Sequence, residues 1–324
     1  MTAEIVGETG TITLVTGGTG FIGSAVAREL TEERESVQVL TRNPFTIPRS
    51  RRVAGVYYVK GDVFDPPSLE KAMEGCWAVV NATQFDKAPF ENPRKGLTYE
   101  HIDGEGTERQ VEVAKKAGVK RFIYLSGAGT RDGRSEPWFR AKLRAEKAVK
   151  ESGMNWTIFR PSWIYGPEDR SLNKFATFAR FLPFIPLIGM GTEKIQPIFV
   201  DDIARIVAKA LSMPVTYGQT YDVGGPQELT MREIARIMLK VQEKRRLILP
   251  QPKALMKLVA TFLQFLPGPP LTPGGVDFVT MEEKVDNTPL LSTFSISLTP
   301  LEEGLKTYMG SLNSTPEENQ RDAA

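Results

Sequence analysis

Four glycines between residues 17 and 23 form the segment most clearly suited to chemistry. They follow the apolar run TITLVT and precede a segment with helical apolar spacing. Glycines permit a tight turn and a close approach of backbone, so free N–H groups and the positive end of a helix can hold a pyrophosphate. We therefore predict dinucleotide binding here rather than an ordinary Gly-rich turn. The residues expected to contact the dinucleotide are Gly17, Thr19, Gly20, Phe21, Ile22 and Gly23.

The residue after the second predicted strand indicates which dinucleotide binds. An NAD-selective site places Asp or Glu there to bind the ribose hydroxyls, whereas this chain has Arg42. A guanidinium complements a phosphate dianion, and Arg49, Arg51 and Arg52 follow in the next loop. We predict that NADP(H) is favoured over NAD(H), the alternative being that these arginines form a solvated basic loop.

These residues need a sheet that brings strand ends together. From residue 11 to about 211, short β-rich runs alternate with helical patterns, which is typical of parallel βαβ units. We expect an α/β fold with a Rossmann-type doubly wound parallel sheet, which binds ligands at the carboxyl ends of its strands. The predicted strands are Ile12–Val15, Val37–Leu40, Val56–Val59, Ala78–Asn81, Phe122–Leu125 and Thr157–Phe159. The predicted helices are Phe21–Leu30, Ser68–Glu74, Tyr99–Ala117 and Trp138–Ser152.

The pattern loosens after residue 211. Thr220–Val223 is predicted as a strand, and Thr230 and Glu233 have the spacing of a capping box that opens a helix. The remainder is rich in proline. We expect an NAD(P)-binding Rossmann core over 11–225, a smaller C-terminal substrate-side lobe over 226–310 that also draws on about 166–200, and flexible tails at 1–10 and 311–324.

Composition excludes several classes of function. Among 324 residues, 41 Lys and Arg nearly balance 39 Asp and Glu, so electrostatics do not favour nucleic acid as a partner. One Cys and one His exclude an internal disulfide and a Cys/His metal cluster, so we expect a reducing compartment and a site without metal. The sole cysteine, Cys76, fits a small core residue. The first ten residues lack the apolar region of a secretory signal, so a cytoplasmic location is expected.

Several short motifs occur in a characteristic order along the first 225 residues. They are Thr16–Gly23, Gly61–Val63, Asn81–Thr83, Leu125–Gly127 and Arg160–Pro167. This ordered set resembles the extended and atypical short-chain dehydrogenase/reductases. The run from Arg160 to Phe175 is most similar to the short-chain-dehydrogenase-like accessory subunit of respiratory complex I and its bacterial relatives. The resemblance implies an oxidoreductase-type nucleotide pocket.

The resemblance also implies roles for individual residues. Asp62 and Val63 would meet the adenine, and Asn81, Ala82 and Thr83 would line the cofactor after the fourth strand. Ser126 would end the fifth strand beside the nicotinamide. Pro161 and Ser162 would approach the carboxamide end.

One residue that the family needs for catalysis is replaced. Active members carry a Tyr and a Lys four residues apart, so that the ammonium lowers the phenol pKa and holds the nicotinamide ribose. Lys142 is present here, but the Tyr position is Trp138. An indole N–H can donate a hydrogen bond but cannot ionise near neutral pH, so it cannot relay the proton that accompanies hydride transfer.

Three interpretations remain open. In the first, Ser126, Tyr165 or a water held by Lys142 replaces the phenol, and the protein is an oxidoreductase acting on a hydrophobic carbonyl-type substrate. In the second, it is a catalytically silent nucleotide-binding accessory or assembly subunit of a respiratory or other membrane complex. In the third, another tyrosine, Tyr99 or Tyr124, approaches the nicotinamide.

Two apolar stretches, 175–190 and 254–266, accompany these motifs. Each contains charged, polar or proline residues, and the second would reach only about 20 Å as a helix, short of a bilayer core of roughly 30 Å. They either pack the smaller lobe, line a hydrophobic small-molecule pocket or contact a membrane surface, so peripheral membrane association is one expectation.

Overall fold

The computed structural model describes residues 12–86, 90–169, 172–265, 271–282 and 285–309, apart from the side chains of Ser50, Lys174, Phe178, Arg180 and Phe278. The tails expected at 1–10 and 311–324 lie outside the described residues. The chain forms two compact units. Unit 1 takes in the described residues up to Pro161, with Val200–Val223 and Asp286–Ile296, whereas unit 2 takes in Ser162–Phe199, Gly224–Val285 and the described residues from Ser297.

Unit 1 is built on a seven-stranded sheet in the order β11-β6-β5-β4-β1-β2-β3. Every neighbouring pair is parallel. The strands are β1 (Ile12–Thr16), β2 (Ser36–Thr41), β3 (Tyr57–Lys60), β4 (Cys76–Asn81), β5 (Arg121–Leu125), β6 (Asn155–Pro161) and β11 (Gln219–Val223). The strand order reverses between β1 and β4, which is where a doubly wound sheet binds its ligand. The expected fold class is confirmed.

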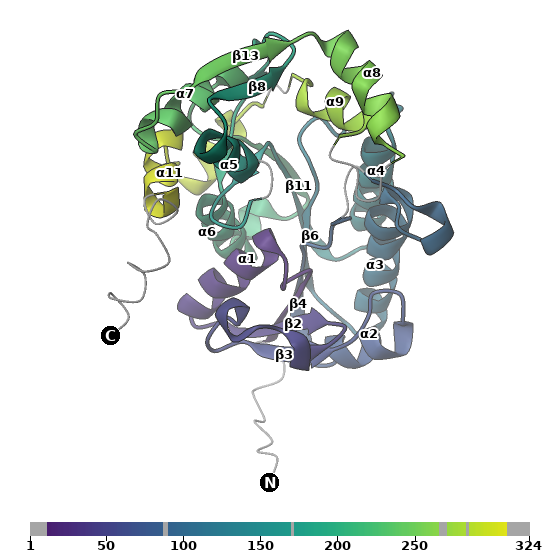
Figure 1. Ribbon diagram of the computed structural model, residues 1–324. Helices are drawn as coiled ribbons and strands as arrows, with labels where there is room; N and C mark the ends of the chain where they lie inside the picture. The colour runs from purple at the N-terminus through teal and green to yellow at the C-terminus, as the bar shows by residue number, and fades with distance from the viewer. Residues whose placement is uncertain (1–11, 87–89, 170–171, 266–270, 283–284, 310–324) are drawn as a thin grey trace. The chain divides into compact units, whose positions relative to one another are not determined.

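Helices cover both faces of this sheet. Figure 1 shows α1 and α6 on one face and α2, α3 and α4 on the other. The helices of unit 1 are α1 (Phe21–Glu32), α2 (Pro66–Met73), α3 (Gly106–Lys116), α4 (Pro137–Lys150), α6 (Val200–Leu211) and α10 (Thr288–Phe294). Both α2 and α4 begin at a proline, because the first helical position needs no N–H partner.

One predicted helix has a different geometry from the expected one. The segment predicted as a single helix over Tyr99–Ala117 begins as a π-helix over Glu100–Glu105 and continues as α3. The wider turn was not predictable from apolar spacing. π-Helical segments are rare in proteins, and those that exist are frequently found at functional sites.

The core of unit 1 lies between the sheet and its helices. Strand residues such as Leu14, Val79, Phe122 and Ile158 are fully buried. Arg121 is also buried, and its guanidinium donates to the carbonyls of Asn155 and Ala210, which ties the end of α6 to the sheet. Burial lowers the pKa of Arg121 to about 10. These contacts hold the strand ends in fixed register.

Unit 2 contains short strand pairs and helices. Its strand pairs are β7 (Ile164–Tyr165) with β10 (Ile198–Phe199), β9 (Lys194–Ile195) with β12 (Leu229–Thr230), and β8 (Phe184–Ile188) with β13 (Leu247–Gln251). Its helices are α5 (Leu172–Phe181), α7 (Met231–Val241), α8 (Lys253–Leu263), α9 (Pro273–Val279) and α11 (Leu301–Met309). The predicted capping box is present: Glu233 N–H donates to Thr230 Oγ1 at 3.2 Å, and Thr230 N–H donates to Glu233 Oε2 at 2.8 Å.

Candidate functional site

The glycine-rich loop connects β1 to α1 and is tightly packed. Gly17 has φ +71°, and a Cβ there would lie 2.4 Å from the carbonyl oxygen of Ala82. A Cβ on Gly23 would lie 2.3 Å from the carbonyl oxygen of Gly17. Only glycine fits either position, so the loop can close against the segment after β4.

The start of α1 carries backbone donors suited to an anion. Gly20 precedes the helix, and its N–H donates to Gly17 O at 2.9 Å. Gly20 has no side chain to cap the first turn, which contains Phe21 and Ile22, and Thr19 is exposed beside it. The free N–H groups of the first turn and the helix dipole together favour a bound phosphate.

A buried hydrogen-bond network links the strand ends next to this loop to α3. Thr16 Oγ1 donates to Gln110 Oε1 at 2.6 Å, and Asn81 Nδ2 donates to Thr107 Oγ1 at 3.1 Å. Asn81 Oδ1 accepts the N–H of Thr83 at 2.9 Å. The Asn81 side chain is fully buried, and it fixes the backbone of Thr83 at the end of β4.

The candidate adenosine residues follow β2 and β3. Asp62 Oδ1 accepts the N–H of Phe64 at 2.9 Å, which is a local turn, and Val63 packs against the core. Arg42 is exposed directly after β2. Arg52 instead donates to the carbonyl of Pro44 at 2.6 Å and so holds its own loop.

Lys142 on α4 belongs to a buried ion pair. Its Nζ lies 2.8 Å from Asp103 Oδ1 and 5.4 Å from the ring centroid of Tyr124. Burial disfavours the ammonium, but attraction to Asp103 and hydrogen bonds to Asp103 and Tyr124 outweigh it and hold the pKa of Lys142 above its usual range. The π-helix carries Asp103 and brings it to this lysine. The other Asp103 oxygen accepts the N–H of Phe85 at 3.0 Å.

Trp138 lies in an aromatic cluster one turn before Lys142. Its ring centroid is 6.1 Å from that of Tyr99 and 5.5 Å from that of Phe139, and Phe85 packs against Tyr99 at 5.1 Å. Burial raises the pKa of Tyr99 far above its ordinary value, and neighbouring Asp103 and Glu91 raise it further. The cluster is therefore apolar around the family's usual phenol position.

Tyr124, the other alternative proton donor, lies on β5 and is fully buried. Burial raises the pKa of Tyr124 to about 12, against the lowering effect of nearby Lys142. Tyr165 is in unit 2, where it is buried, packs against Phe199 at 5.4 Å and donates to Pro300 O at 3.4 Å. Both phenols are thus buried, Tyr124 beside the Lys142 ammonium and Tyr165 against Phe199 and the carbonyl of Pro300.

Ser126 belongs to a second buried charged group. Its hydroxyl donates to Glu146 Oε1 at 2.7 Å, and Arg160 donates to both oxygens of Glu146 at 2.7 and 2.6 Å. Hydrogen bonding to Glu146 is the main cause that raises the pKa of Arg160. The Ser126 hydroxyl is therefore committed to a carboxylate, which holds it in one orientation.

The remaining candidates lie at the end of β6 and beyond it. Pro161 is the last residue of that strand, and Ser162 follows it as the first residue of unit 2; both are buried. Further along, Asp169 Oδ2 accepts the N–H of Leu172, the first residue of α5.

Sequence reasoning missed the two acidic partners, Asp103 and Glu146. Glu146 follows Lys142 by four residues and so shares its helix face, a spacing that could have been noticed. Asp103 gave no such signal, because the π-helix changes which residues face α4. The family resemblance implied roles for Lys142 and Ser126 but not for the carboxylates that bind them.

Within the described ranges, the structure has no group of three or more His, Cys, Asp or Glu side chains that could hold a metal ion. None of the helices there combines the length and the hydropathy required to cross a bilayer.

Comparison with known proteins decides the family. A family model described as NAD(P)H-binding matches residues 17–214. The chain belongs to this family. The match begins at the glycine-rich loop and ends just after α6, so it covers most of the Rossmann core.

Relatives of this NAD(P)H-binding protein include a subunit of a respiratory complex and an azoreductase. It is 33% identical over 235 residues to the mitochondrial NADH dehydrogenase [ubiquinone] 1 alpha subcomplex subunit 9 of Arabidopsis thaliana, covering 71% of this chain but 57% of the relative. It is 30% identical over 228 residues to an NAD(P)H azoreductase of Xenophilus azovorans, covering 68% of this chain and 71% of that protein. The expected resemblance to extended short-chain dehydrogenases and to the complex I subunit is confirmed.

A solved structure supports the fold of this NAD(P)H-binding chain. The UDP-glucose 4-epimerase of Thermus thermophilus, solved in complex with NAD, matches it with a TM-score of 0.72 at 20% identity. The match covers 94% of this chain and 99% of the epimerase. At this identity the likeness concerns the fold alone.

Proposed function

We propose that this protein holds NADP(H) in its Rossmann core as a bound cofactor and acts as an accessory component of a membrane-associated NADH dehydrogenase. The observation that carries the proposal is the aromatic cluster around Trp138. That cluster puts an indole where the family uses a phenol, so the usual proton relay is missing while the nucleotide loop is intact. The resemblance to the subunit of the Arabidopsis complex supplies the class of partner.

The preference for the phosphorylated dinucleotide rests on Arg42. It is exposed after β2, where an NAD-selective site would place a carboxylate. A guanidinium there can form a bidentate contact with a ribose phosphate. Since Arg52 is engaged by its own loop, Arg42 is the arginine we assign to this contact.

Two measurements test the proposal together. Purified protein should bind NADPH more tightly than NADH in a fluorescence titration, and should oxidise bound NADPH only slowly when given hydrophobic carbonyl or quinone acceptors. Affinity capture from detergent-solubilised membranes of the source cells should recover NADH dehydrogenase subunits. Rapid, acceptor-dependent NADPH oxidation by protein that captures none of those subunits would contradict the accessory role.

The second candidate function is a reductase for a hydrophobic acceptor. The observation that favours it is the 30% identity to an NAD(P)H azoreductase. In that case the Ser126 hydroxyl would have to turn from Glu146 toward the acceptor, or a water held by Lys142 would supply the proton. A steady-state rate that is abolished by Ser126→Ala would support this candidate over the first.

A further inference from the structure

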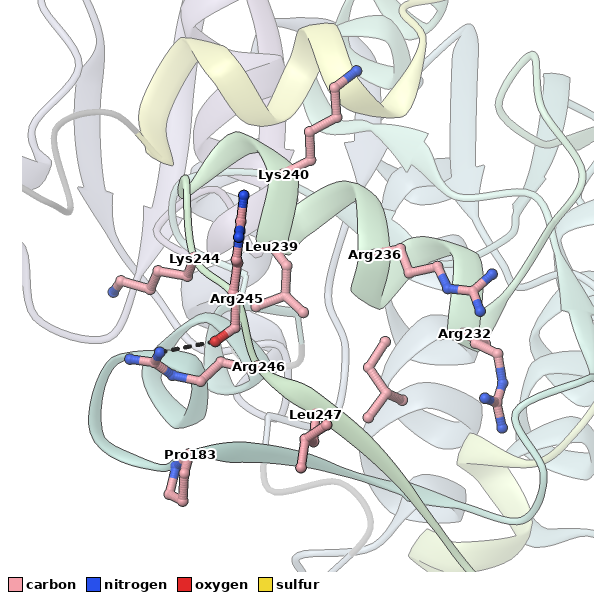
Figure 2. Close-up of a pocket in the computed structure, with 10 residues that line it drawn as sticks. Pro183, Arg232, Arg236, Leu239, Lys240, Lys244, Arg245, Arg246 and Leu247 are labelled. Atoms are coloured by element: carbon pink, nitrogen blue, oxygen red, sulfur yellow. Dashed lines mark hydrogen bonds between the residues drawn. The ribbon is translucent and has the colours of Figure 1, made fainter.

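Unit 2 carries a strongly basic hollow that the nucleotide site does not use. The hollow has a volume of about 600 Å³, and Figure 2 shows the cationic side chains that surround it. They come from α7 and from the loop that follows it. These residues are Arg232, Arg236, Lys240, Lys244, Arg245 and Arg246. Among the described residues that line the hollow there is no Asp or Glu, so the charge on its wall is of one sign.

Three of these cations form a row along α7. Arg232, Arg236 and Lys240 follow one another at intervals of four residues, so they share a helix face and span about 12 Å along its axis. Lys240 also binds Glu302 at 2.8 Å, and Arg232 donates to Met190 O at 3.2 Å. A row of this length is longer than a single phosphate group, and it fits an extended anionic surface better than one small anion.

Large apolar side chains are exposed beside the hollow. Leu247, at its edge, is 68% exposed, and Leu249 lies two residues further along β13 and is also exposed. Strand β13 begins at the hollow and leads into α8. Its five residues therefore place the hollow and the start of α8 about 17 Å apart along the strand. Figure 1 shows α7, β13 and α8 at the same end of the view.

Helix α8 presents an apolar stripe to solvent. Leu255, Leu258, Val259 and Phe262 have the spacing of one helix face, and all four are exposed, with Phe262 69% exposed. On the other side of the helix, Lys253 and Lys257 bind Asp277 of α9. An exposed stripe of this kind is a site for interaction rather than part of the core.

We infer that this basic and apolar face of unit 2 binds the surface of a bilayer that contains anionic phospholipid. The cations of the hollow would meet lipid phosphates, and the stripe of α8 would enter the interface between headgroups and acyl chains. Charge complementarity favours this occupant, and the exposed apolar stripe distinguishes it from a nucleic acid, which would need cations without large aliphatic groups. Of the expected roles for the two apolar stretches, this assigns membrane contact to residues of the second.

Vesicle binding tests the inference with the full chain. We expect cosedimentation with vesicles of phosphatidylcholine mixed with phosphatidylglycerol, weakened by salt, and much weaker binding to vesicles of phosphatidylcholine alone. The triple variant Arg236→Gln, Lys244→Gln, Arg245→Gln should bind the anionic vesicles roughly 100-fold more weakly, because each basic residue near an anionic surface contributes about fivefold to the affinity. Phe262→Ser should lower vesicle affinity roughly tenfold, because one buried aromatic contact is lost.

A matched variant controls for total charge. Lys115→Gln, Lys116→Gln, Lys120→Gln removes three exposed cations from unit 1 and should leave vesicle affinity unchanged. Nucleotide affinity, measured on every variant, should also stay unchanged, so loss of membrane binding alone leaves the proposed function standing. If the triple variant fails to fold, Phe262→Ser, a change of one exposed side chain, provides the test.

Three outcomes would overturn the inference. Equal binding to the two kinds of vesicle would remove the role of the cations. Displacement from vesicles by millimolar glycerol phosphate would show a site for a free phosphate compound instead of a surface. Tighter binding to duplex DNA than to anionic vesicles at the same salt concentration would indicate a nucleic-acid site.

Discussion

The ammonium of Lys142 lies 2.8 Å from the carboxylate of Asp103, and both side chains are buried in unit 1. The family resemblance implies that this lysine serves a cofactor and a phenol. In this protein a carboxylate from the π-helix binds it, and a tryptophan stands in the phenol position. The lysine is therefore held by a carboxylate of the protein itself.

Breaking this pair should be costly. Asp103→Asn leaves a buried ammonium without its counter-ion, so we expect a loss of about 3–5 kcal/mol in the free energy of unfolding. Urea denaturation measures it. The exposed pair of Lys147 and Glu151 on the same helix gives the control, because Glu151→Gln should cost at most about 0.5 kcal/mol. Equal losses for the two variants would refute the importance of the buried pair.

Restoring a phenol should restore chemistry. Trp138→Tyr places an ionisable group one turn from the Lys142 ammonium, and general acid catalysis contributes roughly 10²–10⁴ in rate. We expect NADPH oxidation with a hydrophobic carbonyl acceptor to rise at least about tenfold over Trp138→Phe, which shares the loss of the indole. A wild-type rate as high as that of the tyrosine variant would mean that another group already supplies the proton.

Arg42 should set the preference between the two nucleotides. Arg42→Ala removes a charge-assisted contact to the ribose phosphate, so NADPH affinity should fall by roughly 10- to 100-fold while NADH affinity stays the same. Isothermal titration with both nucleotides checks this. Lys71→Ala, which removes an exposed cation of α2, is the charge-matched control. Similar affinities for NADPH and NADH in the unmutated protein would disprove the assignment.

Gly17 should be intolerant of any side chain. Gly17→Ala combines a positive φ with a Cβ 2.4 Å from Ala82 O, so we expect weakened nucleotide binding and a loss of about 2 kcal/mol or more in stability. Gly118 also has a positive φ, +76°, but a Cβ there would meet nothing within 4 Å. Gly118→Ala therefore isolates the backbone contribution. If both variants lose the same stability and binding, close packing of the loop is unimportant.

The buried thiol of Cys76 predicts a dependence of stability on pH. Burial raises its pKa from 9.0 to about 11, so between these values the unfolded chain loses the thiol proton while the folded chain keeps it. The thiol's contribution to stability is therefore complete below about pH 9 and is lost as the pH rises to about 11. Unfolding curves should show this decline in the wild type relative to Cys76→Ala. Parallel pH profiles of the two proteins would contradict it.

The sequence predicted the parts that depend on local patterns. Alternating apolar runs located the six strands of the first half to within a few residues, and the Thr230 and Glu233 spacing located α7. The glycine loop was identifiable because its flanks were a strand and a helix. Short two-residue strands such as Ile164–Tyr165 escaped prediction, since their pairing depends on partners distant in the chain.

The arrangement around the lysine could not be predicted in the same way. A prediction from helical periodicity assumes 3.6 residues per turn. In the wider turn of a π-helix it therefore places Asp103 on the wrong face of the helix. Likewise, the pairing of Ser126 with Glu146 and Arg160 joins residues from a strand end, a helix and the next strand. Charge and spacing in one segment do not reveal such a group.

The π-helix of Glu100–Glu105 also constrains the number of residues in this segment of the chain. Removing one residue from it would leave an ordinary helix, and everything before the cut would rotate by about 100° relative to α3. If the deleted residue lies between Asp103 and α3, Asp103 would turn away from α4, while Thr107 and Gln110 would keep their contacts with Asn81 and Thr16. The wider turn thus lets one continuous helical segment bind Lys142 through Asp103 and also bind Thr16 and Asn81 through Gln110 and Thr107.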